Sequence, residues 1–191
     1  MPSTHPTPDA PRLLRTATAA LLLALVLGGC IVNDRRSAGT ILDDQSMEFR
    51  IIDAIYSEPE IDNRDHIKVE VYNRVALLVG EARTEANRAT AERVAGEVSY
   101  VDRVVNELAV TERDGAGGRA ENSWLTWKVN AALTRENPVP GIDSTRIQVV
   151  TARNTVYLMG LVTRAEGDAV AEVVRNVGGV EKVVKVFSYM D

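Results

Sequence analysis

The sequence predicts an α+β protein made of two tandem α-β-β-α-β units, each a three-stranded mixed sheet with two helices on one face. The first observation is a repeated hairpin pattern. Alternating apolar residues in 67–71 and 75–80 flank an Asn-containing break, and the pattern returns about 80 residues later in 147–151 and 155–160. Asn tolerates the positive φ that a tight hairpin turn needs. The second observation is a helix after each hairpin, with apolar residues at i, i+3, i+4 and i+7: Ala91, Val94, Ala95 and Val98, then Val170, Val173, Val174 and Val177.

The remaining elements complete each unit. A first helix is expected at 47–56 and at 123–134, and a third strand at 101–110 and at 180–189. Units of about 65 residues bury only ~60% of their unfolded surface, which favours contact between the two copies. The second hairpin strand is apolar on both faces, and two helices can cover only one of them. We therefore expect the other face to pack on the sister domain or on a partner protein.

Gly80 and Gly160 end the second hairpin strand of their units. Both lie on the face expected to point to the core, where a helix would have to approach the backbone closely. We therefore interpret both glycines as structural residues.

The composition excludes several classes of function. The 191 residues carry a formal net charge of -5, and a pI of about 5.2 provides no basic surface for nucleic acid. His5 lies in the N-terminal leader and His66 is interpreted as a solvated loop residue, so histidine supplies neither a base nor a metal site. The acidic segment 58–65 is interpreted as solvated surface. With no catalytic constellation in the sequence, we expect no enzyme, no cofactor and no metal.

The N-terminus has the pattern of a secretory signal that ends at a lipidation site. Arg12 and Arg15 precede an apolar run over 17–27, which is too short to span ~30 Å of hydrocarbon. The run ends in Leu27-Gly28-Gly29-Cys30, and Cys30 is the only cysteine of the chain. These residues resemble a bacterial lipobox, which implies cleavage before Cys30 and attachment of acyl chains to it. Ile31 after the cysteine implies sorting to the outer membrane, by resemblance to lipoproteins of diderm bacteria.

The chain is thereby divided into five parts. Residues 1–29 form a signal peptide, 30–46 a lipidated extended tether, 47–111 the first domain, 112–121 a flexible glycine-containing linker and 122–191 the second domain. Removal of residues 1–29 leaves a net charge of about -6.

Both units resemble BON domains, the modules of bacterial osmotic-shock and envelope proteins. A lipobox followed by two such domains is similar to the dual BON-domain outer-membrane lipoproteins. The similarity includes residues 36–40, 43–44, 123–126, 157–163 and 179–180. This resemblance implies a lipoprotein that binds anionic phospholipid through the first helix of the second domain, gathers at division sites and supports the envelope barrier.

The helix expected at 123–134 carries both tryptophans of the chain. Its core stripe on a helical wheel consists of Leu125, Val129, Ala132 and Leu133. The tryptophans point away from that stripe, and indole rings favour the headgroup boundary of a membrane, where lysine can also reach phosphate. The predicted lipid contact consists of Trp124, Leu125, Trp127, Lys128 and Ala131. The alternative is that one or both rings pack against the sheet of the other domain.

Two functions are compatible with these features. The first is a non-enzymatic, lipid-anchored module on the periplasmic face of the outer membrane that binds anionic phospholipid and acts near the division septum. The second is a scaffold that binds envelope or division proteins through the exposed sheet faces, without direct lipid recognition. The tryptophan pair distinguishes between them.

Overall fold

The computed structural model of the chain describes residues 34–111, 116–139 and 146–191. The expected signal peptide and Cys30 lie outside these residues, as do 112–115 of the expected linker. All elements below belong to one compact part of the chain, residues 35–191, which contains both domains.

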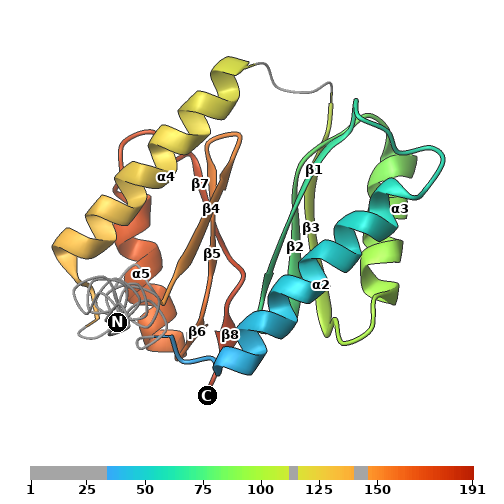
Figure 1. The fold of residues 1–191 in the computed structure, drawn as a ribbon. Coiled ribbons are helices and arrows are strands. Elements are labelled where there is room, and N and C mark those ends of the chain that lie inside the picture. Colours follow the sequence, from blue (N-terminus) through green and yellow to red (C-terminus); the bar gives the residue numbers. More distant parts are fainter. Residues whose placement is uncertain (1–33, 112–115, 140–145) are drawn as a thin grey trace, which may run out of the picture. The chain divides into compact units, whose positions relative to one another are not determined.

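The first domain has the expected order of elements. It comprises α2 (Ala38–Tyr56), β1 (His66–Tyr72), β2 (Val75–Ala82), α3 (Glu85–Glu97) and β3 (Arg103–Val110). Strand β2 is central, antiparallel to β1 and parallel to β3. Both helices pack on one face of this sheet (Figure 1). The mixed three-stranded sheet with two helices is therefore confirmed.

The second domain repeats the order with two interrupted strands. It comprises α4 (Ala116–Glu136), β4 (Gln148–Ala152), β5 (Thr155–Met159), β6 (Leu161–Val162), α5 (Arg164–Arg175), β7 (Lys182–Lys185) and β8 (Ser188–Tyr189). The single third strand expected at 180–189 is wrong, because Val186 and Phe187 separate β7 from β8. Phe187 is buried in the core of this domain beside Gly160 and Gly167, so the chain bends there to insert its ring. Backbone bonds from Val186 to Leu158 and from Ser188 to Gly160 keep the two pieces in register.

Both hairpins close with the predicted tight turn. Asn73 and Arg74 have φ values of 48° and 64°, and Arg153 and Asn154 have values of 49° and 57°. Positive φ at both central residues is typical of a type I′ turn, whose twist matches that of the flanking strands.

Strand β2 is buried along its whole length. One face, with Ala76 and Leu78, belongs to the core under α2 and α3. The other face belongs to a third apolar cluster that contains residues of both sheets: Tyr72, Val75, Leu77, Val79, Val150, Tyr157, Met159 and Val186. The expectation that the second face packs on the sister domain is confirmed.

Helix α2 begins earlier than expected. Residues 38–46 were expected to be extended tether, but they are helical from Ala38, and the side chain of Ser37 accepts a bond from the Thr40 amide at the N-cap. The reason is tertiary: the buried carboxylate of Asp44 accepts bonds from the amides of Asn73 and Arg74 at 2.7 and 2.9 Å. It also accepts a bond from Arg36 at 2.8 Å. Asp44 therefore fastens the start of α2 to the first hairpin turn.

Arg35 makes a second contact ahead of α2. It donates to both carboxylate oxygens of Glu166, at 2.8 Å each, and Glu166 lies in the first turn of α5. The guanidinium lowers the pKa of Glu166 to about 2. The residues just before α2 therefore contact the second domain as well as the first.

The linker is also shorter at its C-terminal end than expected, because α4 begins at Ala116. Residues 116–121 were expected to be flexible, but they form the first turns of α4. Once residues 125–133 are held by the core, the unfavourable nucleation of the helix is already made, and each added residue gains a backbone hydrogen bond that offsets the cost of about 1 kcal/mol for each glycine.

Gly80 lies within β2, which continues to Ala82, so the expectation that it ends the strand is wrong; Gly160 follows the end of β5. Both glycines approach the partner segment of their hairpin rather than a helix. Gly80 has φ +112°, and a Cβ there would overlap the carbonyl oxygen of His66 on β1. A Cβ on Gly160 would lie 3.0 Å from Ile147 Cδ1 and 3.1 Å from the Arg146 carbonyl oxygen. The expected close approach of a helix is therefore wrong, because the obstacle is the chain that pairs with the second strand.

Asp44→Ala should lower the free energy of unfolding by about 3 kcal/mol, because it removes the acceptor of two turn amides and of Arg36. Asp43→Ala removes the neighbouring exposed carboxylate and should change it by less than about 0.5 kcal/mol. Urea denaturation of both variants is the measurement. Equal stability of the two would show that Asp44 does not hold the turn.

Gly80→Ala should destabilise the protein by about 2 to 4 kcal/mol, since it adds both a backbone clash and a strained positive φ. Gly160→Ala should cost only about 1 kcal/mol, because its φ is not positive and its two nearest contacts, Ile147 Cδ1 at 3.0 Å and the Arg146 carbonyl oxygen at 3.1 Å, need only a small shift. Gly160→Val should cost about 1 to 3 kcal/mol. Thermal unfolding that ranked Gly160→Ala as the more damaging alanine variant would contradict this assignment.

Candidate functional site

Helix α4 is positioned by a buried stripe on one side. Leu125, Val129 and Leu133 follow at intervals of four residues and enter the core of the second domain together with residues of α5. Leu125 is 2% exposed, so its assignment to the lipid contact is wrong. The i, i+4 spacing that places it in the core prevents it from reaching a surface ligand.

The two tryptophans lie on the outer surface of α4. Trp124 is 57% exposed and Trp127 is 58% exposed. Their rings stack with centroids 4.6 Å apart and planes 11° from parallel. The i, i+3 spacing on a helix brings them together, and stacking keeps both rings on one edge. The alternative, in which the rings pack on the sister domain, is not observed, because the sheet faces cover one another instead.

Lys128 has a role that the sequence did not indicate. Its ammonium donates to the Gly178 carbonyl, just beyond the C-terminal end of α5. A cation near a helix C-terminus interacts favourably with the helix dipole. Lys128 therefore connects α4 to α5, although it remains beside Trp127.

A shallow groove follows the same edge. It has a volume of about 320 Å³ and lies between α4 and α5. Its walls include Trp127, Ala131 and Arg135 from α4, Val173 from α5, and Val177 just after the end of α5. Ala131 is exposed as expected, and Arg135 pairs with Glu136 at 2.9 Å. The edge is thus an aromatic and aliphatic surface with its charges nearly balanced.

The first domain has a different outer surface on the equivalent helix. Leu42 and Phe49 of α2 are 66% and 74% exposed, but this helix has no tryptophan. Helical periodicity around the buried Met47, Ile51 and Ile55 places Leu42 and Phe49 opposite the core, a signal that the sequence already contained.

Buried polar groups in the first domain serve the fold. Asp65, expected as solvated surface, is buried and accepts bonds from the Arg83 amide at 2.7 Å and the Asn87 side chain at 2.9 Å. This correction follows from the turn into α3, whose backbone needs an acceptor. His66 is also misassigned as a loop residue: it begins β1, and its Nδ1 lies 3.1 Å from the buried Glu81.

These groups do not form a metal site. Within residues 34–111, 116–139 and 146–191, no three His, Cys, Asp or Glu side chains are placed to hold a metal ion. In the same residues, no helix is both long enough and apolar enough to cross a membrane.

The fold and the outer surface of α4 together define the class of the protein. It has two tandem α-β-β-α-β domains, and the second presents a stacked tryptophan pair. The family model of the BON domain matches residues 43–112 and 121–191, and the chain belongs to the BON-domain family. The first match begins at residue 43, inside the segment expected as tether, which agrees with the early start of α2.

Three relatives extend the comparison. The "21 kDa hemolysin" of Actinobacillus pleuropneumoniae is 34% identical over 157 residues, 82% of this chain and 79% of the relative. The "Outer membrane lipoprotein DolP" of Haemophilus influenzae is 29% identical over 178 residues, 93% and 91% of the two chains. The "Osmotically-inducible protein Y" of Escherichia coli is 26% identical over 159 residues, 82% and 77%. The resemblance to dual BON-domain outer-membrane lipoproteins is confirmed.

Proposed function

We propose that this chain is a non-enzymatic outer-membrane lipoprotein, anchored through Cys30, whose second domain contacts anionic phospholipid through the exposed edge of α4. The observation that carries the proposal is the stacked, more than half-exposed pair of Trp124 and Trp127. Stacking removes only part of the two indole rings from water, whereas a membrane interface accepts their apolar bodies and leaves each N–H in contact with water.

The contact residues are Trp124, Trp127 and Ala131, with Lys128 and Arg135 beside them. The proposed mature chain has a net charge of about -6, which opposes an anionic surface. Lys128 is engaged by Gly178 and Arg135 is paired with Glu136. Burial of the rings therefore supplies most of the affinity, and the basic residues orient the edge.

Similarity to an outer membrane lipoprotein over 93% of the chain supports the proposed location. The proposed role is support of the envelope barrier at the periplasmic face of the outer membrane, concentrated at the division septum. The scaffold alternative relied on exposed sheet faces, and the residues of those faces are buried in the cluster shared by the two sheets. No separate observation favours it.

Cys30 should carry acyl chains as the first residue of the mature protein, because small residues precede this single cysteine at the end of an apolar run. Mass spectrometry of the N-terminal peptide from membrane-extracted protein is the measurement. Cys30→Ser should abolish processing. Detection of an unmodified Cys30, or of cleavage at another position, would reject the anchor without affecting the proposed α4 contact.

Replacing both Trp124 and Trp127 by alanine should weaken vesicle binding of the unacylated chain by about 2 to 4 kcal/mol, taking ~25 cal/mol per Å² and partial burial of each ring. The exposed rings contribute little to the core, so the double variant should fold normally. The wild-type tryptophan fluorescence should shift to the blue when anionic vesicles are added.

The matched control replaces Leu42 and Phe49 of α2 by alanine. These side chains are at least as exposed as the tryptophans but lie in the first domain, so vesicle binding should be retained. Equal vesicle binding by the folded tryptophan double variant, or loss of binding only in the control, would overturn the assignment to α4.

A further inference from the structure

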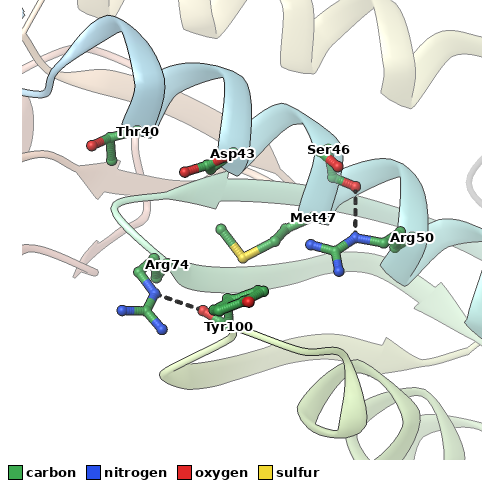
Figure 2. A pocket seen from close by; sticks show the side chains of 7 residues that line it. All are labelled: Thr40, Asp43, Ser46, Met47, Arg50, Arg74 and Tyr100. Carbon is green, nitrogen blue, oxygen red and sulfur yellow. Dashed lines mark hydrogen bonds between the residues drawn. The ribbon is translucent and has the colours of Figure 1, made fainter.

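A larger pocket lies in the first domain, on the side of α2 that faces the first hairpin turn. Its volume is about 660 Å³. It is open on one side and lined by Thr40, Asp43, Ser46, Met47, Arg50, Arg74 and Tyr100. Figure 2 shows the Met47 side chain between the edge of α2 and the opposite wall of Arg74 and Tyr100. The buried Met47 forms an apolar floor.

Tyr100 is held in a conformation that its type disfavours. Its φ is +74°, and the residue is 72% exposed beside the pocket. The corresponding residue after the second helix of the other domain is Gly179, which has φ +101°. Glycine adopts this conformation without strain, whereas a bulky residue does not. The first domain thus keeps a strained tyrosine at a position where its sister uses glycine, and strain of this kind concentrates at functional positions.

The two domains also differ in the residues that face this loop. In the second domain Lys128 reaches across to Gly178, and a Cβ on Gly179 would lie only 3.1 Å from its Nζ. The equivalent positions in the first domain are Arg50 on the helix and Tyr100 on the loop. Arg50 instead turns along its own helix, where its Nε donates to the Ser46 carbonyl at 3.3 Å. In the second domain the Lys128 side chain fills the space between the first helix and the loop after the second helix. In the first domain the corresponding space is the open pocket.

The pocket presents groups of both charges. Arg74 is oriented by a bond from its Nε to the Tyr100 carbonyl at 2.8 Å and lies 3.2 Å from the exposed Asp102. In the described residues Arg50 makes no ion pair, so its terminal nitrogens are available to a ligand. Asp43 is exposed on the same helix as Arg50. Figure 2 shows the two side chains at different ends of the pocket, with Met47 between them. Guanidinium groups suit phosphate, whereas a carboxylate suits an ammonium group.

We infer that this pocket binds a zwitterionic phosphate ester, with the phosphate on Arg50 and Arg74 and the ammonium group on Asp43. A ligand with phosphate alone would meet the opposing charge of Asp43, and an amine alone would meet two guanidinium groups. Only a ligand that carries both charges matches all three side chains. Thr40 and Ser46 add hydroxyl groups, and Met47 accommodates the carbon chain between the two charges. This site is separate from the tryptophan edge of α4.

The test is calorimetric titration of the full-length chain in non-ionic detergent with O-phosphoethanolamine, glycerol 3-phosphate and ethanolamine. O-phosphoethanolamine should bind, and the other two should bind about tenfold more weakly or not at all. The double variant Arg50→Gln, Arg74→Asn should weaken binding of O-phosphoethanolamine by about tenfold or more. Asn at position 74 tolerates the positive φ and matches Asn154 of the second domain. Asp43→Asn should abolish the preference over glycerol 3-phosphate.

Arg93→Gln on α3 is the matched control, because it removes one exposed charge from the same domain without touching the pocket. It should leave binding within about twofold of wild type. The variant with both tryptophans replaced should also bind normally, which separates this site from the proposed lipid edge. Thermal unfolding confirms that each variant is folded.

Dihexanoyl phosphatidylethanolamine below its micellar concentration identifies the source of the ligand. Tighter binding than O-phosphoethanolamine assigns the pocket to a lipid headgroup, and binding of the soluble ester alone assigns it to a free metabolite; both results support the site. Unchanged binding by the folded arginine double variant, or equal binding of glycerol 3-phosphate and O-phosphoethanolamine by wild type, would overturn it.

Discussion

The two central strands β2 and β5 carry apolar side chains on both faces, and the rest of the architecture depends on removing both faces from water. In β2, Ala76 and Leu78 pack under the helices, while Val75, Leu77 and Val79 enter the cluster shared with the second sheet. A fully buried Val or Leu contributes about 1.5 to 3 kcal/mol. Exposing one face would therefore cost a large part of the free energy of unfolding of a domain of this size. The two small domains stabilise each other through the faces that their helices leave uncovered.

This packing decides which surfaces remain for function. Because the sheet faces are occupied by one another, binding must use the helices, their loops and the grooves beside them. The duplicated first helices have diverged in this respect. Helix α4 presents two stacked tryptophans, and its lysine is engaged by the loop after α5. Helix α2 presents two exposed apolar residues on one side and a charged pocket on another. Duplication has thus produced two similar cores with two different outer surfaces.

Buried carboxylates determine how the chain enters these cores. Asp44 accepts bonds from the first hairpin turn, and Asp65 accepts bonds from the turn into α3. Both replace water as the acceptor of backbone amides that would otherwise be left unpaired. Arg35 adds a paired contact with Glu166 in the second domain. The segment just before α2 is consequently held at both domains.

The local sequence pattern by itself determined the fold class, the duplication, the hairpins and the two-sided apolar strands, because these arise from the spacing of apolar residues; the tight turns followed from the Asn in each break, which tolerates positive φ. It also placed Trp124 and Trp127 away from the core stripe. Only the tertiary structure decided that residues 38–46 are helical, that Leu125 is fully enclosed, and that Lys128 bonds to Gly178. It also decided that the free sheet faces cover each other and that Arg50, Arg74 and Tyr100 line one pocket. These outcomes depend on side chains distant in sequence meeting in space, and local spacing carries no information about such meetings.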